Sequence, residues 1–514
     1  MIFGTVGPLI VATTAIALLV WFSICRKRRL TPPGPRGWPL IGNMFDVPRK
    51  ESWKVYLEWS NRYNSDIVSM RVAGTQFMIL NSAKAIQDLL IKRSNIYSDR
   101  PHSTMIIDLM KTTWLIVFMN NNDRWKVHRH LFKREFDSPE ASVVNKKHAL
   151  QASRRLIGRL LSSKDHEGEL RLAAVDSILS ITYGITPTDF EHPFIKVTGQ
   201  VNEIFADVAR GTYLVDVFPF LKKLPRWLPG LQFLKIGDRG RGLARDVVVG
   251  PYNEIQAQVE KGTAVPSVAS RFLSAIQDGE KMQPGEVDAM RNVLANAYLA
   301  GSDTSICVLY NFVLAMALHP EVQKKAQKSL DDVLRGDRLP NFEDFDRAPY
   351  LAATVNEIFR WHPVTPFAVY HVSTQDDVYN GYHIPKGSII VPNAWGMLRD
   401  ENLFGLDTHK FNPERFVRPD GTINYGLSAV DMAFGYGRRA CPGRVIARDT
   451  VWIMAATMLA AYDIVDPVDL EGNKLTADTP LEYTNAMVSF APPFKVSFKR
   501  RIPEGIIRDA VPDE

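Results

Sequence analysis

Ten residues near the C-terminal end constrain the fold of this chain more than any other stretch. The segment Phe434-Gly-Tyr-Gly-Arg-Arg-Ala-Cys441-Pro-Gly443 places a cysteine in a glycine-rich turn, and an apolar helical pattern from Val445 to Tyr462 follows it. Glycine lets the backbone approach a flat ligand closely, and the N-terminus of a helix favours a thiolate. A lone cysteine is more often a small buried apolar side chain. Here, however, six constrained positions fall within the ten residues.

This loop resembles the heme-binding loop of the cytochrome P-450 superfamily, Phe-x-x-Gly-x-Arg-x-Cys-x-Gly, with no departure. The resemblance implies the cytochrome P-450 fold, which is mainly α with small β-sheets, and heme b as the cofactor. It also implies that the thiolate of Cys441 is the axial ligand of the heme iron, which favours O–O cleavage. The chain looks most like fungal microsomal members, many of which belong to secondary-metabolite pathways. The cofactor-binding residues that the resemblance places in the loop are Phe434, Gly435, Gly437, Arg439, Cys441 and Gly443.

Two further motifs follow the order that the family shows along the chain. Glu357-Ile-Phe-Arg360 puts an acid and a base on one helix face, which alone would describe an ordinary surface pair. It is similar to the family's Glu-x-x-Arg, and Pro413-Glu-Arg-Phe416 lies between it and the cysteine. The resemblance implies that Arg415 completes a triad with Glu357 and Arg360, and that this triad supports the heme loop without taking part in the chemistry.

A long helical pattern from Gln283 to His319 contains Ala300-Gly-Ser-Asp-Thr-Ser305 at its middle, which lowers its helix propensity. One interpretation is a kink in which the Thr304 hydroxyl binds a carbonyl one turn earlier. The stretch also resembles the family's Ala/Gly-Gly-x-Asp/Glu-Thr-Thr/Ser. This implies that Gly301 leaves room for dioxygen and that Asp303 and Thr304 are the catalytic acid and alcohol. Dioxygen cleavage in a dry pocket requires two protons, so it needs a positioned relay.

Heme carries two propionates, which need cationic partners when they are buried. Trp125 and Arg129 lie one helical turn apart and resemble the family's C-helix motif. Arg439, two residues before the cysteine, matches the family's propionate-binding arginine. The resemblance adds Arg100 and His371 as further propionate partners, although a lone arginine or histidine is more often a surface or structural residue.

The substrate is predicted from two apolar segments, 102–119 and 205–234, which match the roof of the family's substrate pocket. Core packing is the commoner use of such side chains. Segments 364–368 and 483–488 match other pocket walls, and Asp303 is the one evident charge. This lining predicts a neutral, lipophilic substrate from the bilayer, such as a terpenoid, polyketide, steroid or aromatic compound. The predicted substrate-pocket residues are Ala300, Gly301, Val364, Phe367 and Met487.

The N-terminus predicts a membrane anchor. No charged side chain occurs from Met1 to Cys25, and four consecutive basic residues, Arg26 to Arg29, follow. The length suits one helical span, and a basic cluster after the apolar run argues against a cleaved signal peptide. Because these four charges supply most of the net +6, the basic pI of about 9.0 does not indicate a nucleic-acid surface. We expect a single-pass protein of the endoplasmic reticulum whose catalytic domain faces the cytosol.

The domain organisation follows from these features. The body has helical patterns at 53–64 and over most of 83–335, a β-hairpin around Gly74, and strand-like pieces at 367–392 and in the last forty residues. Three distant cysteines exclude a disulfide framework. The predicted parts are an anchor with a basic stop-transfer cluster (1–30), a Pro-rich hinge (31–48) and one heme-thiolate catalytic domain (49–514).

Three functions are compatible with these motifs. The first is a monooxygenase of secondary metabolism or xenobiotic oxidation. Since the chain has no flavin or nicotinamide fingerprint, it would receive NADPH-derived electrons from a membrane-bound NADPH-cytochrome P-450 reductase, with cytochrome b5 as a second candidate donor. Arg438, Arg444 and Arg448 are candidates to dock an acidic partner surface. The others are a heme-thiolate isomerase or dehydratase that works without O₂, and a non-enzymatic membrane protein that binds heme or lipid. The intact Asp303-Thr304 pair favours the monooxygenase.

Overall fold

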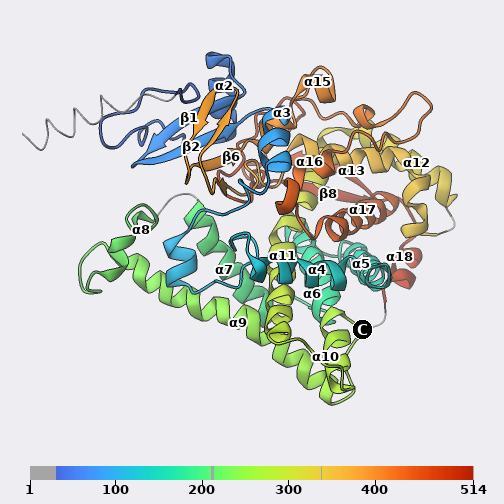
Figure 1. Ribbon diagram of the computed structural model, residues 1–514. Helices are drawn as coiled ribbons and strands as arrows, with labels where there is room; N and C mark the ends of the chain where they lie inside the picture. Colours follow the sequence, from blue (N-terminus) through green and yellow to red (C-terminus); the bar gives the residue numbers. More distant parts are fainter. Residues whose placement is uncertain (1–29, 210–212, 337, 513–514) are drawn as a thin grey trace, which may run out of the picture.

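The computed structural model describes residues 30–209, 213–336 and 338–512. Most of the described chain is helical, and the strands form three small sheets, so the predicted combination of many helices with little sheet is confirmed. The predicted anchor, residues 1–30, lies outside the described residues except for Leu30. In Figure 1 the strands β1, β2 and β6 stand at one end of the molecule, beside the mass of helices.

The helical core is built around α11 (Glu286–Leu318), which is buried along most of its length. Within the described ranges, α11 is the one helix long and apolar enough to cross a membrane, but 78% of its apolar window is buried inside the protein. It packs against α4 (Asp123–Phe136), α6 (His166–Tyr183) and α17 (Arg444–Ala461). This burial makes α11 the central helix of a globular core.

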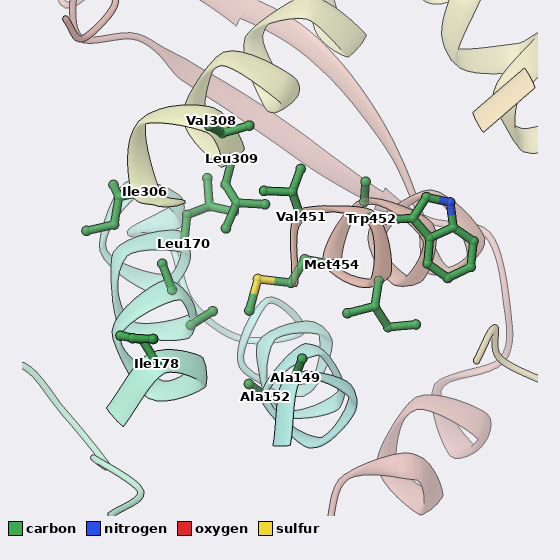
Figure 2. Packing of buried hydrophobic residues seen from close by; sticks show 14 of the residues in the cluster. Ala149, Ala152, Leu170, Ile178, Ile306, Val308, Leu309, Val451, Trp452 and Met454 are labelled. Carbon is green, nitrogen blue, oxygen red and sulfur yellow. The ribbon is translucent and has the colours of Figure 1, made fainter. Parts of the chain in front are cut away.

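Figure 2 shows how four helices meet in that core. Side chains of α6, α11 and α17 converge with the small Ala149 and Ala152 of α5 (Pro139–Arg159). Alanines at these positions let α5 approach α6 and α17 closely. Because α11 carries one sequence motif and the cysteine loop leads directly into α17, the packing of these two helices sets the distance between the two motifs.

The main sheet joins segments that are far apart in the sequence. β1 (Ile67–Val72) and β2 (Thr75–Leu80) form the predicted hairpin, with positive φ at both turn residues, 45° at Ala73 and 88° at Gly74. β2 then pairs in parallel with β6 (Ile389–Pro392), which pairs antiparallel with β3 (His371–Val372). This pairing brings His371 to the edge of the helical core.

The last part of the chain differs in one respect from the sequence prediction. β7 (Tyr462–Val468) and β8 (Lys495–Arg500) form a two-stranded sheet, as β4 (Asp377–Tyr379) and β5 (Tyr382–Ile384) do. The segment after β8 is not a strand but the helix α18 (Glu504–Ala510), which buries Ile507 against the core and packs on α5. A helix of about two turns with one buried residue carries too little periodicity to be recognised from sequence.

The remaining elements connect these layers. The other α-helices are α2 (Ser52–Tyr63), α3 (Ala83–Ile86), α7 (Pro193–Ala209), α8 (Leu214–Val217), α9 (Gln232–Glu260), α10 (Val268–Gln277), α12 (Pro320–Leu334), α13 (Pro349–Trp361), α14 (Ala394–Met397), α15 (Glu401–Phe404) and α16 (Ala429–Ala433). The π-helices are η1 (Gln87–Lys92) and η2 (Thr104–Leu109), and the 3₁₀ helices are η3 (Pro219–Lys223), η4 (Phe342–Arg347), η5 (Pro413–Phe416) and η6 (Gly437–Arg439).

Candidate functional site

The motifs of the sequence meet around one internal cavity of about 530 Å³. α11 supplies one wall, the cysteine loop before α17 supplies the opposite region, and α4, α6 and α7 close the sides. The predicted residues that line this cavity are Arg100, Trp125, Arg129, Ala300, Gly301, Asp303, Thr304, Val364, His371, Phe434, Gly435, Arg439, Cys441, Gly443 and Met487.

Cys441 is held at the floor of the cavity by a tight loop. Its backbone N–H donates to the carbonyl of Phe434 (2.7 Å), Gly435 has a φ of 84°, and Gly443 is the N-cap of α17. The residue is enclosed by protein, and its exposed surface faces the cavity. Burial raises the pKa of the Cys441 thiol, while the backbone N–H of Gly443 and the nearby Arg129 act in the opposite direction. A metal ion bound to the sulfur would add the positive charge that ionises the thiol.

Three arginines gather on the cavity wall without an acidic partner. Arg100, Arg129 and Arg439 make no ion pair within 4.0 Å in the part of the chain that the structure describes. Burial lowers the pKa of each, that of Arg439 to about 10. Trp125 lies between two of them, with its ring centroid 5.7 Å from the Arg129 guanidinium and 4.4 Å from that of Arg439.

The hydrogen bonds that the side chains of Arg100 and Arg439 make all go to neutral backbone acceptors. Arg439 donates to the carbonyls of Ser98 (2.6 Å) and Met119 (2.7 Å), and Arg100 donates to two consecutive carbonyls, with the shorter contact at 2.6 Å to Val369. A buried group of like charges is stabilised by an anion. The two propionates of heme would supply that charge. The residues therefore fit the cofactor that the resemblance implies, with a thiol on one side and cations at the edge.

A hydrogen bond of His371 determines which of its ring nitrogens carries the proton. Its Nδ1 lies 2.6 Å from the carbonyl oxygen of Tyr97, and since a carbonyl only accepts, Nδ1 carries the proton. Burial and the neighbouring Arg100 hold the pKa of His371 well below its usual value, so the ring is neutral and Nε2 is an acceptor. A carboxylate beside Nε2 would favour a second proton there.

The acid and the alcohol of α11 both lie on the cavity wall. The hydroxyl of Thr304 donates to the carbonyl of Ala300 (2.7 Å), one turn earlier. Burial raises the pKa of the Asp303 carboxyl, and the side chain of Asn202 on α7 opposes this shift. The helix kink predicts the hydrogen bond from Thr304 to the carbonyl of Ala300. The proton relay requires that Asp303 and Thr304 lie beside the cavity, as they do. The arrangement is compatible with both interpretations.

Gly301 is required by packing of a neighbouring helix. A Cβ atom at this position would lie 2.7 Å from Cγ1 of Ile178 on α6, closer than two carbons approach. The sequence prediction gave room for dioxygen as the reason for this glycine. The Ile178 side chain gives a second reason for a glycine here, and the predicted role stays a prediction, since Gly301 also lines the cavity.

The predicted triad is assembled in a fully buried location. Arg360 donates to both carboxylate oxygens of Glu357, at 2.6 and 2.7 Å, and Nε of Arg415 lies 3.8 Å from the same carboxylate. Burial raises the pKa of Glu357, and the two guanidinium groups oppose that shift. The helix that carries the pair touches the cysteine loop, since the rings of Phe359 and Phe434 are 5.2 Å apart.

Two of the residues predicted to contact the cofactor or the substrate do not line the cavity. Phe367 turns away from the cavity and packs on Trp53 and Tyr56, and its ring centroid lies 6.0 Å from that of Trp53 and 5.5 Å from that of Tyr56. The next residue, Ala368, lines the cavity instead. Gly437 faces π-helix η1, where a Cβ would lie 2.5 Å from the carbonyl oxygen of Leu90. This glycine therefore serves the close approach of two backbones.

The structure adds wall residues that sequence reasoning missed. Ile178 comes from α6 and Asn202 from α7, and neither lies in a recognisable motif. Asn296 of α11 holds the roof, because its amide donates to the carbonyl of Trp114 (2.9 Å) and accepts from the N–H of Ile116 (2.9 Å). A polar residue on a long apolar helix was the one signal that could have pointed to Asn296.

Comparison with known proteins agrees with this site. The family model described as Cytochrome P450 matches residues 32–487. The chain is similar to the cytochrome P450 monooxygenase eriA of Hericium erinaceus, at 43% identity over 99% of this chain and 96% of that protein. It is also similar to the cytochrome P450 monooxygenase ple1 of Rhodocybe pseudopiperita (37%, covering 96% and 94%). A further relative is the tryptamine 4-monooxygenase of Psilocybe cyanescens (37%, covering 93% and 94%).

Proposed function

This chain belongs to the cytochrome P450 family, and from that premise we propose that the Cys441 thiolate binds the iron of heme b at the floor of the cavity. The protein is a heme-thiolate monooxygenase, and its electrons come from NADPH through a reductase partner. The observation that carries the assignment of the site is the thiol of Cys441 opening onto a cavity whose wall holds three arginines that make no ion pair within the described residues.

Each part of the cavity wall would have its own task. When bound, heme supplies one-electron chemistry and the activation of dioxygen. Arg100, Arg129 and Arg439 would neutralise and orient its two carboxylates, since bidentate guanidinium groups suit that geometry. Trp125 would keep two of these guanidinium groups in place through its ring face.

Proton delivery is assigned to α11. Because burial raises the pKa of Asp303, its carboxyl keeps a proton to higher pH than an exposed aspartate would. The Thr304 hydroxyl would leave the carbonyl of Ala300 to donate toward the cavity, and would take a replacement proton from the direction of Asp303.

The substrate would be a neutral lipophilic molecule. The roof and side walls are formed by apolar residues of the segment 115–118 and of α7, with Val364 and Met487 opposite. Terpenoids, polyketides, steroids and aromatic compounds all fit such a wall. Relatives that include one named for tryptamine support a role in fungal secondary metabolism.

The protein would be anchored in the membrane of the endoplasmic reticulum with its catalytic domain in the cytosol. The support is the uncharged N-terminal run followed by four basic residues. NADPH-cytochrome P450 reductase, with cytochrome b5 as a second donor, would dock near Arg438, which is exposed. Arg444 and Arg448 already pair with Asp431 (2.7 Å) and Asp449 (2.9 Å), so they would contribute less free charge.

The test is reconstitution of the full chain with a reductase, NADPH, O₂ and a panel of terpenes, steroids and polycyclic aromatics. We expect a hydroxylated product whose new oxygen comes from ¹⁸O₂ and whose formation requires the reductase. A rearranged product that forms without O₂ and without the reductase would contradict the monooxygenase and support the isomerase or dehydratase.

Thr304→Ala tests the relay. We expect the variant to bind heme and substrate and to consume NADPH, but to release more hydrogen peroxide. The yield of product per NADPH should fall by about tenfold or more, because a positioned proton donor contributes at least that much. Asp303→Asn should slow turnover itself. The measurement is product, peroxide and NADPH in the same reaction.

Ser302→Ala is the matched control for this experiment. Ser302 makes the same kind of bond, to the carbonyl of Tyr298 (2.7 Å), but is 2% exposed and lies off the cavity. It should lose some stability and keep the yield per NADPH. An unchanged yield of product per NADPH in Thr304→Ala would contradict the proton relay and leave the helix kink as the role of the Thr304 hydroxyl.

Deletion of residues 1–30 tests the anchor. We expect a shorter protein that still binds heme but no longer sediments with membranes washed at high salt, because the uncharged run that would cross the bilayer is gone. Trp227, which is 80% exposed, and Phe220 leave a second apolar contact, so weak association at low salt is compatible with this expectation. Detection of a cleaved N-terminus on the mature full-length protein would contradict the anchor.

A further inference from the structure

A buried serine connects three separate elements to one wall of the cavity. Segment 484–490 lines the cavity through Thr484, Ala486, Met487, Val488 and Phe490, whereas Ser489 faces the opposite way and is fully buried. Every polar atom of Ser489 has a partner among the described residues. Its N–H donates to the carbonyl of Val364 (2.8 Å), and its carbonyl accepts from the thiol of Cys307 (3.2 Å) on α11.

The hydroxyl of Ser489 closes the segment on itself and joins it to His362. It donates to the carbonyl of Thr484 (2.9 Å), so its oxygen accepts from Nε2 of His362 (2.9 Å). His362 is the C-cap of α13, and its ring is stacked on Tyr483 at 3.4 Å between centroids. The burial that keeps this imidazole neutral also leaves no water to replace the bond from His362 to Ser489.

These contacts tie two cavity walls together. Val364 lines the cavity and is bonded to Ser489 through its carbonyl, so the wall at 364 and the wall at 486–488 keep a constant separation. Without the Ser489 hydroxyl, the Nε2–H of His362 would lose its partner in a buried location, whereas the carbonyl of Thr484 would still accept from the N–H of Ala486 (3.0 Å). The turn is also closed at its ends, because the N–H of Thr484 donates to the carbonyl of Phe490 (2.9 Å) and the N–H of Phe490 donates to the Thr484 hydroxyl (2.8 Å). The Ser489 hydroxyl is a side-chain bond that ties this closed turn to the end of α13.

We propose that Ser489 is a positioning residue for substrate recognition, which sets the width of the cavity between Val364 and Met487 without touching the substrate. The proposal rests on the proposed function, since it takes this cavity to be the substrate site. His362 acts with Ser489, and Cys307 secures the same segment to α11.

The test uses the full-length heme-loaded protein and two azoles that bind heme iron. Clotrimazole is large enough to reach the segment 484–490, and imidazole is too small to do so. In Ser489→Ala we expect the Kd for clotrimazole, read from the Soret shift, to rise about tenfold, and the Kd for imidazole to stay unchanged. His362→Phe keeps a ring on Tyr483 but has no N–H. It should likewise raise the Kd for clotrimazole and leave the Kd for imidazole unchanged.

Ser153→Ala is the matched control. Ser153 is also fully buried, and its hydroxyl donates to the carbonyl of Leu150 (2.7 Å), but it lies away from the cavity. It should lose a similar amount of thermal stability and keep both azole constants. Equal changes of the azole Kd values in Ser153→Ala and Ser489→Ala would overturn the proposal. So would an unchanged ratio of the clotrimazole Kd to the imidazole Kd in both Ser489→Ala and His362→Phe.

A second readout does not use the heme. In a Cys25→Ala background, with the labelled position identified by peptide mapping because Cys441 also remains, the buried thiol of Cys307 should react slowly with a maleimide. Ser489→Ala should make Cys307 react faster, since it loosens the segment that covers the thiol. Labelling that stays as slow as in the parent protein would overturn the proposal. If no lipophile is oxygenated but the azole ratio and the labelling change as expected, the proposed function fails and the role of Ser489 in shaping the cavity stands.

Discussion

Cys441→Ser is expected to abolish the long-wavelength Soret band of the reduced carbon monoxide complex and to reduce product formation to background. The reason is that a serine hydroxyl stays protonated at the position where a thiolate must donate electron density to iron. The loop itself should keep its shape, because the N–H of residue 441 still donates to the carbonyl of Phe434. The measurements are the reduced-CO difference spectrum, heme content and product yield with the reductase.

Cys307→Ser provides the matched control for this loss. Cys307 is fully buried on α11, lies off the cavity wall and is the second free cysteine among the described residues. Its variant should keep the long-wavelength band. A Cys441→Ser protein that retained the band would show that another residue is the ligand, and the assignment of the whole site would fail.

Glu357→Ala should produce the largest loss of stability of any single change in the site. Both side chains of the Glu357–Arg360 pair are completely shielded from solvent, and the carboxylate also accepts from the N–H of Asn412 (2.7 Å). Removing it leaves the guanidinium of Arg360 buried without its charge partner, a cost of about 3–5 kcal/mol. Against a total stability of roughly 5–15 kcal/mol, that cost should leave little heme-loaded protein at 37 °C.

The measurement is heme content per polypeptide together with the thermal unfolding midpoint. Asp332→Ala is the control, because Asp332 pairs with Lys328 at 3.1 Å on the surface of α12, with side chains 64% and 76% exposed. It should change neither quantity measurably. A Glu357→Ala protein with normal heme content and an unchanged midpoint would show that the triad does not support the loop.

Local motifs were predictable because their geometry depends only on neighbours in the chain. The spacing of Trp125 and Arg129, and of Glu357 and Arg360, puts each pair on one face of α4 or α13 whatever surrounds the helix. The turn at Ala73 and Gly74 likewise followed from two strand-forming runs separated by residues that adopt positive φ.

Contacts between distant segments were not predictable from those patterns. The parallel pairing of Phe77 with Ile389 places His371 at the cavity edge, and nothing in either strand specifies the other as its partner. Phe367 illustrates the same limit, because an apolar residue near a pocket segment can satisfy its burial equally well on Trp53 and Tyr56.

The sequence predicted which residues would carry the chemistry, since a cysteine in a glycine-rich loop before a helix and an acid–alcohol pair on another helix are local features. The tertiary structure decided what stands around them. It brought Arg100, Arg129 and Arg439 from three segments to one wall, set Ile178 against Gly301 and bonded Ser489 to His362 and Cys307. The physical reason is that apolar burial drives these segments together without direction, and only close packing and the pairing of buried polar groups select one arrangement among many.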